Sequence, residues 1–245
     1  MKIAKRFLAM LLVVASIFSL CACGMTKEEK AYKEEVENAV GIYPKWAETT
    51  VFYEIFVRSF ADSNGDGIGD FKGIEENLDY LEELGIGAIW LMPMMESTTY
   101  HGYDVVDYYS PNPDYGTMED FDSLVEECHK RDIKVIIDFV VNHSSSSNEW
   151  FTTALADENS KYRDYYFIEE TIPVDETDET YSYWRQDEGT GLYYYAHYDT
   201  IMPDLNYNNQ ELRDEIKNVA TFWLEHDIDG FRLDGAKEID TDINV

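Results

Sequence analysis

The stretch Gly230-Phe231-Arg232-Leu233-Asp234 decides how this chain folds and where its chemistry lies. Its alternation is typical of a short buried strand, in which Arg232 and Asp234 point to one side and Phe231 and Leu233 to the other. A cation beside a carboxylate favours the ionised form that a covalent nucleophile needs. We therefore expect a catalytic carboxylate at one end of a sheet, close to the last residue of the chain.

Upstream of this strand, apolar runs alternate with amphipathic helical patterns. Strands are predicted at residues 51–57, 88–92, 135–141 and 230–234, and helices at about 74–85, 118–128 and 209–223. The run at 135–141 is apolar almost throughout, as expected for a parallel strand that is covered on both faces. The order β-α-β-α-β, an insertion and then α-β indicates a parallel α/β protein. Periodicity alone does not distinguish a barrel from an open, doubly wound sheet.

Local signals mark the ends of these helices. Gly85 is expected to end the first helix, and Asn209 to begin the last. Thr117 and Asp120 have the spacing of a capping box, which predicts a helix start. Cys128 falls on the apolar stripe of the helix that follows, so we expect a buried thiol and not a reactive one.

A long insertion occupies residues 144–207, after the third predicted strand. It is rich in aromatic side chains, and the alternation around Gly189-Thr190-Gly191 predicts a small hairpin. A loop of this length is normally a subdomain or a functional segment. In parallel α/β folds the carboxyl ends of the strands carry the chemistry, and this insertion leaves such an end.

Composition limits the classes of partner. With 44% hydrophobic and 15% aromatic residues, the 245-residue chain can bury a sizeable core as one domain or two. The formal net charge of −31 repels phosphate backbones, so we expect no nucleic-acid partner. High acidity suits calcium binding and export, although a solvated acidic surface is its default explanation.

The N-terminus has the pattern of an export signal. A basic head is followed by an apolar stretch, residues 7–20, that is too short to span a bilayer. The motif Leu20-Cys21-Ala22-Cys23-Gly24 resembles a bacterial lipoprotein signal with Cys23 as the lipidated residue; an ordinary cleaved signal peptide is the alternative. We expect a signal peptide at 1–22, a tether at 23–46, and an exported protein anchored to the membrane at the cell surface.

Two further segments accompany the opening one, in a fixed order. They are Asp138-Phe139-Val140-Val141-Asn142-His143 and Met202-Pro203-Asp204-Leu205-Asn206. With residues 230–234, they resemble the conserved regions of the alpha-amylase family, glycoside hydrolase family 13. The resemblance covers residues 47–245 and implies a (β/α)8 TIM-type barrel, here truncated after its fourth strand. It places the first part of the barrel at 47–143, a domain B insertion at 144–207 and an incomplete continuation of the barrel at 208–245.

The resemblance assigns roles to the residues of these segments. Asp234 matches the catalytic nucleophile, and Arg232 matches the residue that orients it. His143 matches a histidine that binds the sugar at the cleavage subsite. Asp138 matches a structural residue beneath the site, and Asn142 one that is linked to a calcium site in some members.

Further substrate-binding residues are implied on either side. Tyr103, in the motif Tyr100-His101-Gly102-Tyr103-Asp104, matches a stacking platform for the sugar, and His101 a hydrogen-bond donor; a core tyrosine in a loop is the alternative for Tyr103. Lys237 matches a residue near the leaving-group subsites. Glu238 stands where many amylases have histidine, which leaves the specificity open.

The loop at residues 62–70 predicts a calcium site. Oxygen-bearing side chains at alternate positions, with glycines between them, can wrap a hard cation. An EF-hand is rejected because the twelfth position is Gly73, and a dinucleotide loop because Asp70 stands in place of the third glycine. The loop resembles the calcium site of oligoglucosidase-like family members, and a metal-free turn is the alternative. The implied ligands are Asp62, Asn64, Asp66, the Ile68 carbonyl and Asp70.

The resemblance implies hydrolysis of α-1,4-glucosidic bonds in starch or malto-oligosaccharides by a retaining mechanism. Such a mechanism needs a carboxylic acid about 5 Å from the nucleophile. In the family this acid is a Glu after the fifth strand, and an Asp after the seventh stabilises the transition state. Both are expected beyond residue 245, so the chain alone is expected to be inactive. A non-catalytic surface glucan-binding lipoprotein and an inactive fragment are the alternatives.

Overall fold

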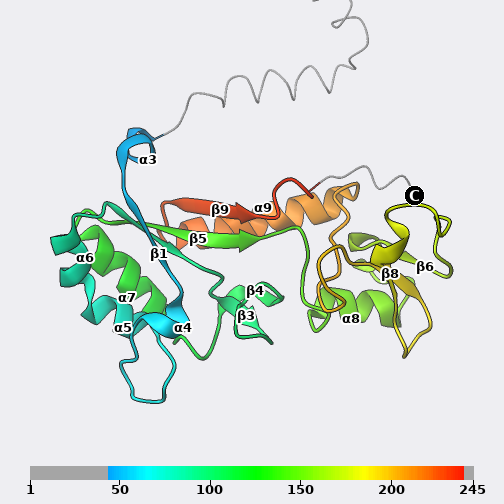
Figure 1. Ribbon diagram of the computed structural model, residues 1–245, viewed down its shortest axis with the longest axis horizontal. Helices are drawn as coiled ribbons and strands as arrows, with labels where there is room; N and C mark the ends of the chain where they lie inside the picture. Colours follow the sequence, from blue (N-terminus) through cyan, green and yellow to red (C-terminus); the bar gives the residue numbers. More distant parts are fainter. Residues whose placement is uncertain (1–43, 240–245) are drawn as a thin grey trace, which may run out of the picture. The chain divides into compact units, whose positions relative to one another are not determined.

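The computed structural model describes residues 44–239, which belong to two units divided between Thr50 and Val51 (Figure 1). The described part of the first unit contains the short helix α3 (Lys45–Thr49). The second unit contains all the other elements. The predicted signal peptide, Cys23 and the tether up to residue 43 lie outside the described residues. No helix within the described part is long and apolar enough to span a membrane.

A parallel sheet of four strands organises the second unit. In spatial order the strands are β1 (Phe52–Ile55), β2 (Ala88–Leu91), β5 (Lys134–Val140) and β9 (Gly230–Asp234). All three pairings are parallel, with Asp138 opposite Arg232 and Val140 opposite Asp234. The predicted parallel α/β organisation is therefore confirmed, and the carboxyl ends of the strands meet at one edge.

Amphipathic helices lie between consecutive strands along the chain. They are α4 (Val57–Phe60), α5 (Phe71–Glu76), α6 (Leu78–Leu84), α7 (Met118–His129) and α9 (Gln210–Glu225). The rings of Phe121 in α7 and Trp223 in α9 meet edge to face with centroids 5.4 Å apart, and both side chains are fully buried. Burial of large apolar side chains, each contributing about 2–3 kcal/mol, drives this packing.

The predicted helix ends are confirmed where a side chain or a glycine caps them. Thr117 and Asp120 form the capping box of α7, and Asn209 accepts a hydrogen bond from the Leu212 N–H at the start of α9. Gly85 ends α6 in the left-handed region, with φ of 77°. These residues satisfy backbone groups that helix ends leave unpaired.

Three local predictions were wrong. The first strand is shorter than residues 51–57, because buried Val57 begins α4 instead. The first predicted helix is two helices, because Asn77 leaves the helical conformation between α5 and α6. The strand β9 is only half-buried, with Leu233 50% exposed, because in the described structure it is the edge of the sheet.

The segment between β5 and α9 forms a small substructure, called the insert here (residues 144–207). It contains α8 (Glu149–Ala156), η1 (Arg163–Tyr165), η2 (Tyr181–Tyr183) and a sheet of β6 (Ile168–Glu169), β8 (Tyr193–Tyr195) and β7 (Trp184–Gln186). The predicted hairpin around Gly189-Thr190-Gly191 is confirmed, since β7 and β8 pair antiparallel across it. An isolated bridge between His143 and Asp204 ties the insert to the segment that follows β5.

A second, unpredicted hairpin follows β2. Its strands β3 (Met95–Ser97) and β4 (Val105–Pro111) pair antiparallel with register shifts. Trp223 of α9 donates a hydrogen bond from Nε1 to the Tyr108 carbonyl at 2.8 Å, which fixes β4 against the helical layer. The hairpin thereby holds the loop that carries His101 and Tyr103.

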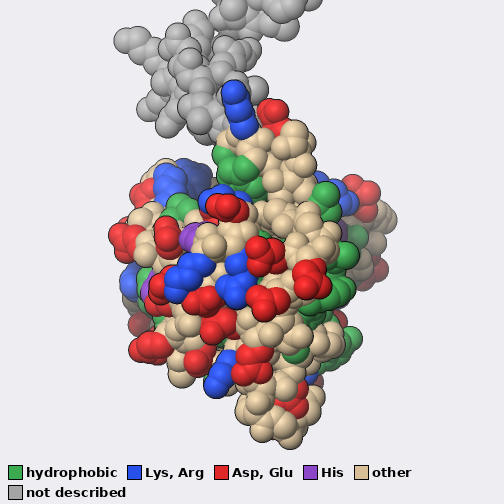
Figure 2. All heavy atoms as spheres, turned by 90° about the vertical axis from the view of Figure 1, so that its left-hand side faces the viewer, with side chains coloured by type: hydrophobic (Ala, Val, Ile, Leu, Met, Phe, Trp, Pro, Cys, Tyr) green, Lys and Arg blue, Asp and Glu red, His purple; other side chains and the backbone are tan. Residues whose placement is uncertain are grey.

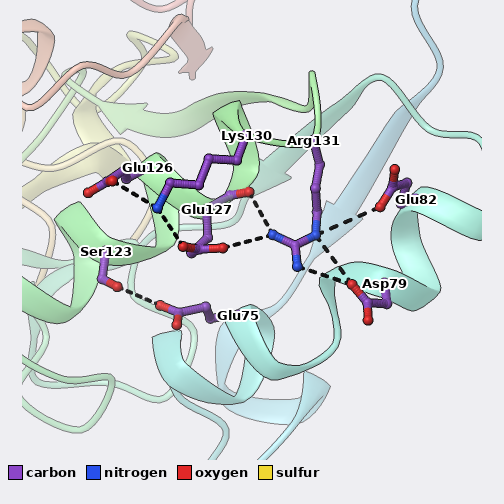
Figure 3. A network of polar contacts seen from close by, with 8 residues as sticks. All are labelled: Glu75, Asp79, Glu82, Ser123, Glu126, Glu127, Lys130 and Arg131. Atoms are coloured by element: carbon purple, nitrogen blue, oxygen red, sulfur yellow. Dashed lines mark hydrogen bonds and ion pairs between the residues drawn. The ribbon is translucent and has the colours of Figure 1, made fainter.

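The surface over α6 and α7 mixes the excess acidic side chains with basic ones (Figure 2). Arg131 joins the two helices, because its guanidinium lies 3.1 Å from Asp79 and 3.8 Å from Glu82 of α6 and 2.9 Å from Glu127 of α7 (Figure 3). Isolated surface ion pairs contribute little to the free energy of unfolding. The Arg131 side chain, however, is three-quarters buried and its guanidinium is shared by three carboxylates, so it fixes the spacing of the two helices.

Candidate active site

Arg232 and Asp234 lie where β9 ends, and they point to the same side of the sheet, as the alternation predicts. The Arg232 Nη1 atom is 2.6 Å from Asp234 Oδ1. The same nitrogen is 3.1 Å from Oδ1 and 3.3 Å from Oδ2 of Asp138 on the neighbouring strand. One guanidinium nitrogen therefore binds two carboxylates, which come from adjacent strands.

The charges in this group are set by burial and by Arg232. Burial raises the pKa of Asp138 to about 6, although the Arg232 cation works in the opposite direction. With its pKa about 6, Asp138 is mostly ionised at neutral pH, and the Arg232 cation favours that form. Burial also lowers the pKa of Arg232, but hydrogen bonding to Asp234 and the charge of Asp138 raise it overall. Arg232 thus remains a cation.

Trp90 is a residue of this group that the sequence analysis missed. The guanidinium carbon of Arg232 lies 5.1 Å from the centre of a Trp90 ring, a cation–π contact worth about 0.5–2 kcal/mol. The Trp90 Nε1 atom is buried without a hydrogen-bond partner among the described residues, so the described contact of Trp90 with this group is that of its ring. The sequence feature that could have identified Trp90 is its position in β2, the strand next to the one that carries Asp138.

Tyr103 and His143 meet next to this charged group. The Nε2 atom of buried His143 is 3.1 Å from the Tyr103 carbonyl, and the Tyr108 hydroxyl donates to the His143 carbonyl at 2.8 Å. Burial lowers the pKa of His143, which favours the neutral imidazole. Burial and the charges of Asp138 and Asp234 raise the pKa of Tyr103 to about 12. Both predicted residues therefore lie near Asp234.

The loop that carries Tyr103 is held by Asp104 and Gly102. Fully buried Asp104 accepts hydrogen bonds from the side chains of Ser97, Thr98 and Thr99, which hold its pKa low despite burial. Gly102 has φ of 83°, and a Cβ there would lie 2.6 Å from the Pro93 carbonyl oxygen. Only glycine fits this position.

His101 lies beside Tyr103, with their ring centres 5.9 Å apart. Its Nδ1 atom accepts a hydrogen bond from the Tyr103 N–H at 3.2 Å. Because that nitrogen is an acceptor, Nε2 carries the proton when the ring is neutral. The predicted role of His101 as a hydrogen-bond donor is compatible with this arrangement.

Asp204 and Asn142 connect the insert to the carboxyl end of β5. Buried Asp204 accepts the His197 backbone N–H at 3.0 Å and the Asn142 side-chain N–H at 3.3 Å. Burial raises the pKa of Asp204 to about 7, against the effect of these hydrogen bonds. The contacts of Asn142 and Asp204 among the described residues therefore hold the insert against the end of β5.

Lys237 and Glu238 follow β9 in a turn, where the Glu238 N–H donates to the Gly235 carbonyl at 2.8 Å. Their side chains form an ion pair of 2.8 Å, and the ammonium lowers the pKa of Glu238. The Lys237 side chain is 86% exposed. These two predicted residues follow Asp234 in the chain, and only the Lys237 side chain is exposed.

The loop at 62–70 is an exposed turn built by its own acidic side chains. Asp62 accepts hydrogen bonds from the N–H groups of Asn64, Gly65 and Gly67, and Asp66 from that of Ile68. Asp70 turns inward instead, where it caps α5 and accepts from Ser63. Within residues 44–239, no group of three or more His, Cys, Asp and Glu side chains is arranged to hold a metal ion.

Comparison with known proteins shows which family this chain resembles. The profile of the family described as Alpha amylase, catalytic domain, matches residues 54–245. The chain is 49% identical over 199 residues to alpha-amylase 3 of Dictyoglomus thermophilum, covering 81% of this chain and 39% of that protein. It is 44% identical over 204 residues to trehalose-6-phosphate hydrolase of Bacillus subtilis, covering 80% and 36%. The crystal structure of alpha-amylase from H. orenii superposes with a TM-score of 0.72 and 52% identity, covering 79% of this chain and 41% of that one.

Four parallel strands carry a carboxylate and an arginine at their carboxyl ends, the edge at which TIM-type barrels hold their active sites. The chain belongs to the alpha-amylase family of glycoside hydrolases. It spans roughly two fifths of the length of the curated relatives named above.

Proposed function

We propose that the protein to which this chain belongs hydrolyses α-1,4-glucosidic bonds of starch or malto-oligosaccharides and retains the anomeric configuration. The observation that carries the proposal is the 2.6 Å contact between Arg232 and Asp234 at the carboxyl end of β9. Two similar proteins, at 49% and 52% identity, are named alpha-amylases, which favours the α-1,4 linkage. Other relatives are named oligo-1,6-glucosidase and trehalose-6-phosphate hydrolase, so the linkage needs a direct test.

In the proposed reaction, an Asp234 carboxylate oxygen attacks the anomeric carbon while the bond to the leaving oxygen breaks. Arg232 binds Oδ1, which orients the carboxylate and leaves Oδ2 to attack. Tyr103 and His143 border the sugar that is transferred, and the insert corresponds to domain B. A carboxylic acid must protonate the leaving oxygen. The acid of the family is expected outside this chain, so we propose that the 245-residue polypeptide alone does not hydrolyse starch.

The nucleophile can be tested without the acid. Fluoride leaves without protonation, so 5-fluoro-α-glucosyl fluoride should glycosylate Asp234 in this polypeptide. Mass spectrometry of peptides should find one 5-fluoroglucosyl group on the peptide that contains Asp234. The Asp234→Asn variant should remain unlabelled, whereas Asp214→Asn, on the exposed side of α9, should label like the wild type. Label on another residue, or equal labelling of Asp234→Asn, would refute the assignment.

We also propose that Ca²⁺ binds the loop at 62–70. Its donors are all oxygens, which suits a hard cation, and Gly65 and Gly67 have φ of 83° and 92°, which allows tight wrapping. Because Asp70 caps a helix, binding requires its side chain to turn or leaves the ion to the other donors. Calcium should raise the melting temperature, and Asp62→Asn with Asp66→Asn should abolish the rise. Asp175→Asn, in a different acidic loop, is the control. A rise that survives the double variant would refute this site.

For the N-terminus we propose export and lipidation at Cys23, on the strength of the motif at residues 20–24. Cells that express the gene and receive an alkyne-tagged fatty acid should incorporate it into this protein. Cys23→Ser should abolish incorporation, and Cys21→Ser should not. Equal labelling of both variants would exclude Cys23 as the modified residue.

A further inference from the structure

We propose that Trp90 is a positioning residue for the nucleophile, because its ring holds the Arg232 guanidinium in the orientation in which one nitrogen binds two carboxylates. The inference rests on the proposed function, since it assigns a further residue to the same reaction. The residues implied by the family resemblance do not include Trp90. Its role is to act through Arg232, without contact to the sugar.

The register of the sheet brings Trp90 and Arg232 together. Trp90 of β2 is opposite Ile136 of β5. Ile136 is in turn opposite Gly230 of β9, two residues before Arg232. In a parallel barrel the side chains of alternate strands meet in one interior layer, and β2 and β9 are alternate strands with β5 between them. The contact therefore follows from the pairing of three strands that all belong to this chain.

The hydrogen bonds of the Arg232 side chain come from one nitrogen. Within residues 44–239 they are all donated by Nη1, at 2.6 Å to Asp234 Oδ1 and at 3.1 and 3.3 Å to the two oxygens of Asp138. A guanidinium that binds a carboxylate through two nitrogens is fixed in its plane. One that binds through a single nitrogen can pivot about that atom. The hydrogen bonds therefore do not fix the plane of the Arg232 guanidinium.

The Trp90 ring supplies the second constraint. The Arg232 guanidinium carbon lies 5.1 Å from the centre of the ring, within the reach of about 6 Å of a cation–π contact. The Trp90 Nε1 atom is buried without a hydrogen-bond partner in the described part of the chain, so the ring and not the N–H makes the contact. With one side of the guanidinium held by the ring, Nη1 stays between the two carboxylates.

Loss of the ring should weaken the contact with Asp234 more than that with Asp138. Asp138 accepts two of the three hydrogen bonds, and its side chain is fully buried, which further parts of a barrel cannot reverse. Leaving a buried charge unpaired is costly, so a guanidinium that pivots stays with Asp138. The single bond to Asp234 is then lost, and the nucleophile is no longer oriented.

Fluorinated tryptophans at position 90, introduced by nonsense suppression, separate this electrostatic contact from packing. Each fluorine draws electron density from the face of the ring and weakens its attraction for a cation, while the ring nearly keeps its shape. The 245-residue polypeptide is treated with 5-fluoro-α-glucosyl fluoride. The C1–F bond breaks, fluoride departs with the electron pair, and an Asp234 oxygen bonds to C1. Mass spectrometry of the intact chain gives the rate constant at each reagent concentration.

We expect the rate constant at saturating reagent to fall step by step with the number of fluorines. The total fall should be roughly fivefold for tetrafluorotryptophan, equivalent to about 1 kcal/mol, while the half-saturating concentration changes less than about twofold. Trp90→Phe keeps an aromatic face and should retain more of the rate than Trp90→Leu.

Trp184 of the insert is the matched control. Its Nε1 atom is also buried without a partner among the described residues, and no described cation lies over its ring. Tetrafluorotryptophan at position 184 should leave the rate constant unchanged.

The position of Arg232 can be measured without any reaction. Protons above the face of an aromatic ring are shifted upfield in NMR spectra by the ring current. In a chain labelled with ¹⁵N-arginine, the Arg232 guanidinium signal is identified by its absence in Arg232→Leu. We expect this signal to be shifted upfield in the wild type and to lose the shift in Trp90→Leu.

A rate constant that does not change along the fluorinated series would overturn the inference. A rate constant that rises would also overturn it, because fluorination makes the indole N–H a stronger donor and a rise would assign the effect to that group. Absence of the upfield shift in the wild type would refute the placement of Arg232. If the wild type shows the shift but does not react, the proposed function fails, and the role of Trp90 in the reaction fails with it.

Discussion

Replacing Arg232 by Leu should destabilise the protein in a way that depends on pH. The substitution leaves the carboxylate of Asp138, whose side chain is fully buried, without its cation. Breaking a buried pair in this way costs about 3–5 kcal/mol, and the 38% exposure of the Arg232 side chain favours the lower end. We expect a loss of about 3 kcal/mol at pH 7.5.

The pH dependence follows from the pKa of Asp138. Its folded-state pKa of about 6 lies above the unfolded value of 3.8. Burying the ionised carboxylate therefore lowers the free energy of unfolding at pH values above 6, and this loss is absent at pH values below 3.8. Without Arg232 the folded pKa rises further, and Asp138 in the variant binds a proton at a pH where the wild type does not. The loss should shrink by about 1.4 kcal/mol per pH unit between pH 7.5 and 6, about 2 kcal/mol in all. Below pH 6 it should stay constant.

Urea unfolding followed by tryptophan fluorescence at pH 7.5, 6.0 and 5.0 measures these differences. The double variant Arg232→Leu with Asp138→Asn is the control, because it removes the stranded charge. It should be more stable than the single variant at pH 7.5 and should lose the pH dependence. If the single variant loses the same free energy at all three pH values, the account of Asp138 is wrong.

Three further changes test other parts of the structure. In the wild type, Asp204 has a folded pKa of about 7 against 3.8 in the unfolded state, so the free energy of unfolding should fall as pH rises from about 4 to 7. Thermal melts of Asp204→Asn should show a weaker dependence on pH. If the variant keeps the dependence of the wild type, burial does not raise the pKa of Asp204. Thr117→Ala removes the capping box of α7 and should cost about 1 kcal/mol in urea unfolding, whereas Ser123→Ala in the same helix should cost less. Trp223→Phe should cost about 2–3 kcal/mol, because it leaves the Tyr108 carbonyl unpaired; a loss below about 0.5 kcal/mol would mean that water replaces the indole.

The parts of the fold that the sequence predicts correctly depend on near neighbours in the chain. The capping box at Thr117, the cap at Asn209 and the turn at Gly85 are local interactions, and each marks a helix end as expected. The strand at 230–234 has the predicted bounds, because alternation identifies its two faces. Helix α8 was not predicted, because residues 144–207 were interpreted as an insertion with a single hairpin. Its signals are nevertheless local, since Asn148 caps the helix and its buried face contains Trp150 and Phe151.

The parts that failed lack a clear local signal, or depend on residues far apart in the sequence. The hairpin of β3 and β4 pairs with register shifts, and its strand at Met95–Ser97 has no alternating apolar pattern. For the candidate site, the pairing of Arg232 with Asp234 is local, and its prediction is confirmed. The contact of Trp90 with Arg232 spans β5, the strand between β2 and β9, and that of Tyr198 with His143 joins the insert to the end of β5. Such contacts have no signature in a short window of sequence.

The half-covered edge at β9 affects how this polypeptide behaves in concentrated solution. Leu233 offers an apolar side chain on a strand that has one neighbour in the described sheet, and such an edge can pair with a second molecule. The net charge of −31 opposes such encounters through repulsion between whole molecules. Salt screens this repulsion over about 8 Å at 0.15 M, so colloidal stability should decrease as ionic strength rises. Light scattering of the wild type and of Leu233→Lys across a salt series would show whether charge, and not only folding, keeps the polypeptide dispersed.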